Sequence, residues 1–435
     1  MTARSTLPDW SSLAERDRAG ALEQCRDRLS RIGRKLNAVA AEMDPGACGL
    51  GPLAGLPYVA KDMIATGVTA PNWGCSEPLQ SAGNAASIIE SLSGAGACLI
   101  GAAEMTELAY EPSGINGARG NVLNPWNFDF IPGGSSSGSA ALVASGCCYA
   151  ALGSDTGGSV RIPAHCCGVT ALKPTWGRIA VEGAMPLAPS LDTIGVLARS
   201  AADIEQIWGA LFGRDAAQAA GSPSAVVLED AFRESDAEIA GLCRNAIGVL
   251  SKLGMCIEAR TGFPDEADRH CLIVMQAEAA RTHSARMDDI RINAVLRKRL
   301  RKGLSIDDKA YAESLAAREK LRADFCSHYL RDAVVALLPV MPVRTPRFAE
   351  TDPSSPEFKA RTLYALSRFT RFVNYLGLPA LAVPAGFDSR GMPVGLQMVG
   401  RPDSEAVLLG IGKMLQAETN WHGCVPAAIA SDITA

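Results

Sequence analysis

The stretch that decides the fold reads IPGGSSSGSAALVASGCCYAALGSDTGGSVRIPAHCCG and spans residues 131–168. It contains two glycine–serine turns. The first runs from Gly133 to Ser139, and the second is Gly157-Gly158-Ser159. Glycine permits backbone conformations closed to other residues and leaves amide N–H groups uncovered. A serine in such a turn faces a ligand with bare hydrogen-bond donors beside it. This arrangement suits acyl-transfer chemistry, although two plain surface turns would look the same.

Two further interpretations of the first turn fit formally but lack essential parts. Gly133 and Gly138 have the spacing of a phosphate-binding P-loop, but Ser139 stands where that loop needs its lysine. Residues 134–138 also match the G-x-S-x-G elbow of α/β-hydrolases. That elbow needs an apolar strand running directly into the serine, whereas Pro132 interrupts a strand here. It also needs a downstream histidine, and none of the later histidines has a suitable sequence context.

A fourth interpretation uses a lysine as the base. Residues 56–62 read LPYVAKD, a short apolar strand whose end presents Lys61. Burial disfavours the charged form of a lysine and lowers its pKa. A neutral amine can then take a proton from a serine. The alternative is a salt bridge between Lys61 and a neighbour such as Asp62, and the spacing alone leaves both open.

The rest of the chain alternates apolar runs of strand length with amphipathic helices. We predict strands over 56–62, 97–100, 149–152, 333–338, 377–384 and 391–399, and helices over 22–39, 86–93, 139–145, 200–211, 306–330 and 404–419. Such alternation is typical of α/β proteins with a mainly parallel sheet. No low-complexity linker divides the chain, so we expect one domain over residues 1–435.

Composition excludes several classes of protein. With 42 basic and 46 acidic residues, the net charge of −4 favours neither a nucleic acid nor an anionic membrane as partner. The 13 cysteines include no CxxC motif and only five histidines accompany them, so no metal site is expected. There is no apolar run of membrane-spanning length, and the N-terminal segment lacks the apolar centre of a signal peptide. We therefore expect a reduced, cytoplasmic protein in which most cysteines are small core residues.

Taken together, several long motifs resemble the amidase signature enzymes, which are serine hydrolases with a Ser-cisSer-Lys triad. The motifs are GLPYVAKD at 55–62, PGGSSSGSAA at 132–141, LGSDTGGSVRIPA at 152–164, LKPT at 172–175 and GMPVGLQ at 391–397. The resemblance covers 53–200 and 371–435, while the middle, about 213–370, matches only in outline. It implies an α/β fold whose central mixed, mostly parallel sheet is covered by helices on both faces.

The resemblance also implies roles for single residues. Ser159 would be the nucleophile, Ser135 the proton relay that follows a cis peptide bond, and Lys61 the general base. Backbone N–H groups would hold the oxyanion, those of Thr156, Gly157, Gly158 and Ser159. Three side chains would brace the two turns: Asp155, Arg161 and Ser136. No metal or organic cofactor is implied. His165 and the Cys166-Cys167 pair depart from or adjoin the motif, and we expect them to be buried packing residues.

The substrate is the least constrained part of this prediction. Tyr110, Trp126 and Met185 would line the pocket and suggest an apolar substrate portion. We expect a small soluble amide, aryl amide or carbamate as substrate, which includes urethanase activity, and we allow for a homodimer. One alternative is the glutaminase-like subunit of a tRNA-dependent amidotransferase, which works in a complex. A binding protein with a dead site is the other, and the intact triad argues against it.

Overall fold

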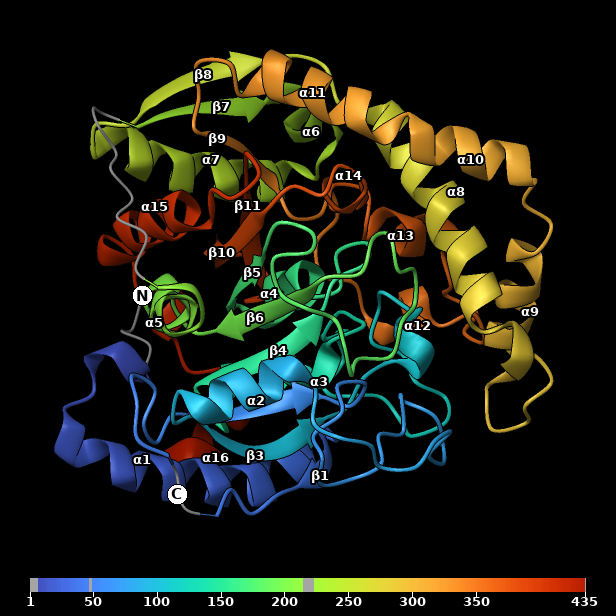
Figure 1. The fold of residues 1–435 in the computed structure, drawn as a ribbon. Helices are drawn as coiled ribbons and strands as arrows, with labels where there is room; N and C mark the ends of the chain where they lie inside the picture. Colours follow the sequence, from blue (N-terminus) through green and yellow to red (C-terminus); the bar gives the residue numbers. More distant parts are fainter. Residues whose placement is uncertain (1–6, 47–48, 214–222, 435) are drawn as a thin grey trace.

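The computed structural model describes residues 7–46, 49–213 and 223–434. Eleven strands of these residues form one sheet in the order β1-β3-β2-β4-β6-β5-β10-β11-β9-β7-β8 (Figure 1). The strands are β1 Val39–Glu42, β2 Pro57–Lys61, β3 Cys98–Ala103, β4 Ala150–Ser154, β5 Thr170–Lys173, β6 Ile194–Ala198, β7 Ser224–Leu228, β8 Cys256–Arg260, β9 Val335–Pro339, β10 Ala380–Phe387 and β11 Pro393–Gly400. The middle region therefore adds three strands, β7 to β9, to the sheet that the motif-bearing segments build.

The sheet is mixed as predicted, but the expectation that it is mostly parallel was wrong. Strand β2 runs parallel to β3 and β4, and β7 runs parallel to β8 and β9. The six remaining pairings, which include all those in the centre of the sheet from β4 to β9, are antiparallel. The reason lies in the connections. A parallel pair needs a long crossover, whereas the short turn 388–392 joins β10 to β11 as a hairpin.

Helices cover both faces of the sheet, as expected. They are α1 Glu15–Arg28, α2 Ser87–Gly94, α3 Ser137–Ala144, α4 Arg161–Cys167, α5 Ala201–Phe212, α6 Glu229–Glu234, α7 Ala237–Lys252, α8 Asp265–Thr282, α9 Ala294–Gly303, α10 Asp308–Ala316, α11 Arg318–Tyr329, α12 Phe348–Thr351, α13 Ala360–Ala365, α14 Arg371–Tyr375, α15 Glu405–Ala417 and α16 Ala430–Thr434. Gly412 of α15 lies against Leu381 of β10, and His165 of α4 lies against Gly395 of β11. Since Leu381 and Gly395 point to opposite faces of the paired strands, α15 and α4 cover opposite sides.

The middle region also supplies a layer of helices beside the sheet. Helices α8, α9, α10 and α11 lie together at one side of the molecule, drawn in yellow to orange (Figure 1). The predicted single helix 306–330 is two helices, α10 and α11, which meet at Ala317. Helix α8 packs against α14, the short helix that opens the last segment of the chain. The layer therefore contacts the motif-bearing part of the fold through α14.

Most cysteines are core residues, as predicted. Eleven cysteines of the described residues form no disulfide, and nine of these are buried. Cys98, the first residue of β3, is disulfide-bonded, which contradicts the expectation of a fully reduced chain. Spacing in the sequence does not reveal which cysteines the fold brings together.

Two neighbouring parallel strands position the candidate site. In β2 and β4, Ala60 lies opposite Leu152, so the carboxyl ends of both strands meet at the same edge of the sheet. Helix α3 packs against both strands. The first glycine–serine turn leads into α3 and the second follows β4, so both turns lie at this edge beside Lys61. Ligand sites of α/β folds commonly occupy this edge.

Close packing of α3 makes its glycine a sensitive position. A Cβ on Gly138 would lie 2.6 Å from Ala38 O and from Glu104 N and O, all of them backbone atoms that cannot rotate away. We predict that Gly138→Ala lowers the free energy of unfolding by about 2–3 kcal/mol or more, because overpacking against backbone forces the elements apart. Urea unfolding followed by circular dichroism measures this loss.

The matched control is Gly410→Ala in α15, where an added Cβ meets no atom within 4 Å. Removing a glycine from a helix interior should stabilise the protein by about 0.5–1 kcal/mol. Equal effects of the two substitutions would contradict the packing derived for α3.

Candidate active site

Lys61 is the last residue of β2, a strand in which every residue is buried. Its amine reaches two hydroxyls: Nζ lies 2.6 Å from Ser135 Oγ and 2.8 Å from Ser154 Oγ. The salt bridge to Asp62 that the sequence left open does not form. Asp62 accepts instead from the N–H of Asn72, at 3.0 Å. Both neighbours of the Lys61 amine are therefore neutral hydroxyls.

Burial decides the protonation state of Lys61. The side chain is completely buried, and this burial lowers the pKa of the amine to about 7. The charges of Asp155 and Asp192 raise the pKa again, but they do not compensate for the lost hydration. Near neutral pH a substantial part of the protein therefore holds Lys61 as a free amine that can accept a proton.

The first turn carries Ser135 to this amine. The peptide bond between Gly134 and Ser135 is cis, as the resemblance implied. Gly134 donates its N–H to Pro112 O at 2.7 Å, and a Cβ on Gly134 would lie 2.5 Å from Glu111 O. Only glycine fits where two backbone segments approach so closely. Ser135 is completely buried, so its hydroxyl is held at Lys61 rather than in solvent.

The second turn is built around the carboxylate of Asp155. Asp155 Oδ1 accepts the N–H of Gly158 at 2.8 Å, and Oδ2 accepts that of Val160 at 3.2 Å. Arg161 donates to both carboxylate oxygens, at 2.8 and 3.0 Å. Burial alone would raise the pKa of Asp155, but the ion pair with Arg161 and the hydrogen bonds hold it well below its usual range. The carboxylate therefore stays ionised and holds the turn closed.

The guanidinium of Arg161 joins this turn to the end of the chain. It is completely buried, and each of its nitrogen atoms has an acceptor. Besides Asp155, Arg161 donates to Asn374 Oδ1 and Gln397 Oε1, both at 2.6 Å, and to Thr370 O at 3.2 Å. A buried charge is tolerated only when it is paired and hydrogen-bonded. The motif around Asp155 and Arg161 thus needs the segment 370–397 to be stable.

One backbone bond links the two turns directly. Ser136 donates its N–H to Ser159 O at 3.2 Å, and Ser136 Oγ accepts the N–H of Ser154 at 3.3 Å. Ser159 is partly exposed, whereas Ser135 is buried. The buried serine therefore lies on the protein side of the exposed one. This is the order that a proton relay from Ser159 through Ser135 to Lys61 would need.

Comparison with known proteins shows the family of this chain. The family model described as Amidase matches residues 21–409. The chain belongs to the amidase signature family. A glutamyl-tRNA(Gln) amidotransferase subunit from Chromohalobacter salexigens is 33% identical, over 92% of this chain and 93% of the relative. A crystal structure described as an amidase has a TM-score of 0.84 at 30% identity, and covers 92% of this chain and 96% of its own. The structure of the corresponding amidotransferase subunit from Thermotoga maritima has a TM-score of 0.80 at 26% identity, over 96% of both chains.

The protein is therefore an amidase that acts on carbon–nitrogen bonds. Among the residues that the structure describes, no group of three or more histidine, cysteine, aspartate or glutamate side chains is placed to hold a metal ion. None of the helices within the same residues is long and apolar enough to cross a membrane.

Sequence reasoning about this amidase missed Ser154, which supplies the second contact of Lys61. Ser154 is the last residue of β4 and, like Lys61, ends a fully buried strand. Its hydroxyl gives the amine a second hydrogen-bond partner besides Ser135. The sequence does show a polar residue closing an apolar strand here, but the pairing of β2 with β4 is needed before that signal points to Lys61.

A second buried lysine shows that a lowered pKa alone does not identify a general base and that the neighbouring groups must also be considered. Lys173 ends β5 and is also completely buried, and burial followed by the charge of Arg161 lowers its pKa to about 7. Its Nζ, however, donates to the carbonyl of Pro174 at 2.7 Å. A carbonyl has no proton to give. Lys173 is therefore a structural group in this amidase, and Lys61 alone of these two lysines contacts serine hydroxyls.

The three predicted pocket residues of the amidase lie in three different places. Tyr110 lines an open cavity of about 520 Å³, together with Glu111 and Arg299. Met185 lines a small cavity of about 50 Å³, one wall of which is Ser154. Trp126 is 5% exposed in a separate hydrophobic cluster and donates its Nε1–H to a backbone carbonyl, that of Cys167. Its contacts are those of a core residue.

The residues that flank the motif are packing groups, as expected. His165 is buried, and its Nδ1 accepts the N–H of Gly395 at 3.0 Å. Burial lowers the pKa of His165 to about 4, so the ring is neutral near pH 7. Burial raises the pKa of the Cys166 thiol to about 12 and holds that of the Cys167 thiol well above its usual range. Neither thiol is a nucleophile near neutral pH, because the thiolate is the reactive form.

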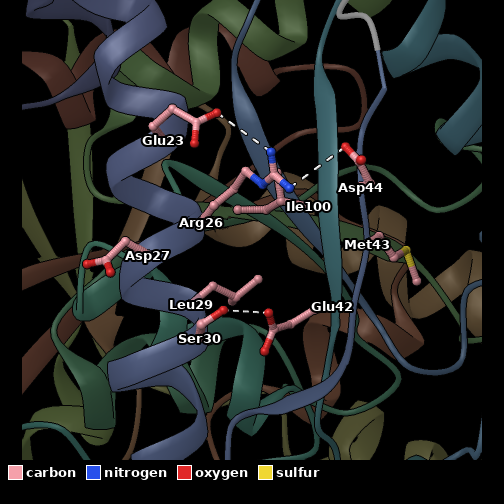
Figure 2. Close-up of a pocket in the computed structure, with 9 residues that line it drawn as sticks. All are labelled: Glu23, Arg26, Asp27, Leu29, Ser30, Glu42, Met43, Asp44 and Ile100. Atoms are coloured by element: carbon pink, nitrogen blue, oxygen red, sulfur yellow. Dashed lines mark hydrogen bonds and ion pairs between the residues drawn. The ribbon is translucent and has the colours of Figure 1, made fainter.

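Another cavity of about 510 Å³ lies where α1 faces β1 and β3, and Figure 2 shows its lining. Arg26 points between two carboxylates, 3.6 Å from Glu23 and 3.8 Å from Asp44. Ser30 Oγ donates to Glu42 at 2.5 Å. None of the predicted site residues lines this cavity. The other two carboxylates, those of Asp27 and Glu42, pair with Arg31 and Arg34 outside the lining. The cavity therefore adds nothing to the amidase site.

The contribution of the buried ion pair at the second turn to the stability of the fold can be tested. We predict that Arg161→Met lowers the free energy of unfolding by about 3–5 kcal/mol, because it leaves the Asp155 carboxylate buried without its counter-ion. Chemical denaturation of the purified variant measures the loss. Arg233→Met is the control, since its ion pair with Asp230 is largely exposed and should matter little. A variant Arg161→Met as stable as the control would contradict the role given to this pair.

Proposed function

We propose that the protein hydrolyses a small carboxamide through an acyl-enzyme formed on Ser159. The observation that carries the proposal is the 2.6 Å contact between the buried Lys61 amine and the Ser135 hydroxyl. A lysine held largely neutral beside a serine can act as a general base. The bond between Ser136 N–H and Ser159 O brings the partly exposed serine next to this pair.

In the proposed reaction, Lys61 takes the proton of Ser135 while Ser135 takes that of Ser159. Ser159 Oγ then attacks the amide carbonyl, and a tetrahedral intermediate forms. Ser135 returns a proton to the leaving nitrogen, the carbon–nitrogen bond breaks, and the amine or ammonia departs. Water, deprotonated along the same path, hydrolyses the acyl-enzyme. Splitting one difficult step into two easier ones is the gain from covalent catalysis.

Fewer backbone N–H groups are available to bind the oxyanion than the motif alone predicts. Gly158 N–H already donates to Asp155, at 2.8 Å. The N–H groups of Thr156, Gly157 and Ser159 have no acceptor among the residues that the structure describes. We therefore assign the oxyanion to these three donors, with Gly158 as part of the support. One such donor typically contributes about 3 kcal/mol to transition-state stabilisation.

The comparisons favour the glutaminase-like alternative over a self-contained hydrolase of aryl amides or carbamates. The relatives at 29–34% identity are named as a subunit of glutamyl-tRNA(Gln) amidotransferase, and one of them matches over 98% of this chain and 100% of its own length. We therefore propose a small primary carboxamide of the glutamine type as substrate, with ammonia passed to a partner subunit.

One observation keeps the self-contained hydrolase as a second candidate. The alignment with the relative from Ralstonia pickettii runs over 511 positions, and this chain has only 435 residues in all. The relative therefore has segments with no counterpart in this chain. Since extra segments are where a subunit can hold its partners, this difference favours an enzyme that works alone.

A substrate test separates the two candidates. Purified protein is given glutamine, a simple aliphatic primary amide, an anilide and an aryl carbamate, and the released ammonia or amine is measured. The glutaminase-like proposal predicts ammonia and glutamate from glutamine, with little release from the anilide and the carbamate. Fast anilide or carbamate hydrolysis with no glutamine turnover would support the second candidate instead.

The triad itself is tested by substitution. On the substrate that the wild type hydrolyses fastest, we expect Ser159→Ala to lower kcat/KM by about 10⁴-fold or more, because the nucleophile is lost. Lys61→Ala should lower it by about 10³-fold, the usual range for a general base. Circular dichroism confirms that each variant is folded. A folded Lys61→Ala protein with undiminished activity would rule out Lys61 as the base.

The pH dependence follows from the lowered pKa of Lys61. Only the neutral amine accepts a proton, so kcat/KM should fall about tenfold per pH unit below pH 7 and level off above it. Rates measured from pH 5 to 9 give this profile. Lys35→Met, which removes a lysine whose ion pair with Asp432 is partly exposed, should leave the midpoint unchanged. A profile flat between pH 5 and 9 would contradict the role of Lys61.

A further inference from the structure

We propose that Thr370 is a positioning residue that locks the peptide between Gly157 and Gly158, and so fixes the oxyanion donors beside Ser159. The inference rests on the proposed function, since it gives Ser159 and its neighbouring N–H groups their catalytic role. Thr370 lies outside all the motifs on which that function was predicted, 211 residues after Ser159 in the sequence. It reaches the turn only through the fold.

Both ends of this one peptide unit are held. Thr370 Oγ donates to Gly157 O at 2.6 Å, and the N–H of the same peptide, that of Gly158, donates to Asp155 Oδ1 at 2.8 Å. A second carbonyl, that of Ser367, lies 3.1 Å from Thr370 Oγ. A hydroxyl has one proton, and the shorter contact is to the turn. The peptide is therefore fixed from two sides by groups that are far apart in the sequence.

The turn needs such a clamp because both of its central residues are glycines. Glycine visits backbone conformations on either side of φ = 0 at little cost, and Gly158 stands at φ +126°. A coupled rotation about the bonds that flank this peptide would exchange the directions of its C=O and N–H. Because Gly158 N–H points to Asp155, this exchange would turn the Gly157 carbonyl toward the Asp155 carboxylate, which would repel it. The turn that presents the N–H groups of Gly157 and Ser159 to the oxyanion would then have to rearrange.

The placement of Thr370 shows that its hydroxyl is directed at the turn rather than at its own helix. Thr370 occupies the N-cap position of α14, where a threonine hydroxyl ordinarily accepts an N–H of the first helical turn. No such capping bond is formed here. The side chain is completely buried, and Thr370 O in turn accepts from Arg161, at 3.2 Å. Thr370, which holds the turn through its hydroxyl, is itself held in place by the ion pair of Asp155 and Arg161.

Packing at Gly158 supports the same conclusion. A Cβ on Gly158 would lie 2.3 Å from Thr370 Oγ and 2.8 Å from Thr370 Cβ. Thr370 therefore occupies the space that any other side chain at position 158 would require. The close contact leaves the hydroxyl little freedom to turn away from Gly157 O.

The test compares Thr370→Val, which keeps the shape and removes the donor, with Thr370→Ser, which keeps the donor. Two readouts are used: kcat and KM on the best carboxamide substrate of the wild type, and the rate at which a fluorophosphonate labels Ser159, located by mass spectrometry. We expect Thr370→Val to lower kcat and the labelling rate by about tenfold to a hundredfold, with KM changed less than about threefold. Thr370→Ser should stay within about threefold of the wild type in both readouts.

Thr170→Val is the matched control. Thr170 is a buried threonine of β5 whose hydroxyl also donates to a carbonyl, Arg199 O at 2.8 Å, but away from the turn. The Thr170→Val variant should have a lower melting temperature than the wild type and the same kcat. If Thr370→Val does not fold, Thr370→Ala carries the same expectation for kcat.

The outcomes are distinguishable. A folded Thr370→Val enzyme with wild-type kcat and wild-type labelling of Ser159 would overturn the role of Thr370 and leave the proposed function intact. A loss that appears in KM alone, or equally in Thr370→Ser, would also overturn it. A wild-type protein that neither hydrolyses a carboxamide nor is labelled at Ser159 would instead refute the proposed function, and this inference with it.

Discussion

The contact between the buried amine of Lys61 and the hydroxyl of Ser135 is the constraint on which the rest of the site depends. A lysine with no counter-ion can stay at the end of a buried strand only by giving up its charge over much of the physiological pH range. The surroundings meet this condition, because the amine touches two hydroxyls and the two carboxylates whose charges act on it are bound to other groups. Asp155 is bound to Arg161, and Asp192 accepts Thr156 Oγ at 2.7 Å. The same burial that places Lys61 thus prepares it to accept a proton.

Around this contact, distant parts of the chain meet at one edge of the sheet. Lys61 ends β2, Ser135 precedes α3, and the turn with Ser159 follows β4. The last segment of the chain then closes the arrangement from the other side, through Asn374 and Gln397 on Arg161. Three stretches of sequence are needed to hold the second glycine–serine turn in place. This explains why the motif residues are found in blocks separated by long intervening regions.

Much of this could be predicted from the sequence, and the remainder has a physical reason for being hidden. Lysine at the end of an apolar strand and serines between glycines are local patterns, so Lys61, Ser135 and Ser159 could be proposed as site residues once the motifs that hold them were matched to a known family. Ser154 and Thr370 reach these groups through strand pairing and helix packing, which no local pattern encodes. The prediction that the strands are mostly parallel was wrong for a related reason. A helix between two consecutive strands indicates a crossover, but β4 pairs with β6 and β5 pairs with β10, strands that are not consecutive in the sequence. Their relative direction therefore cannot be predicted from a single connection.

The most direct test of the account is the ionisation of Lys61 itself. With lysine labelled by ¹⁵N in the side chain, the Nζ resonance that disappears in Lys61→Met can be followed from pH 5 to 11 by NMR. The account predicts a titration midpoint near pH 7, because burial next to neutral hydroxyls disfavours the ammonium form. A midpoint near 10.5, the ordinary value for a lysine, would mean that the amine stays charged in the folded protein and would contradict the central claim.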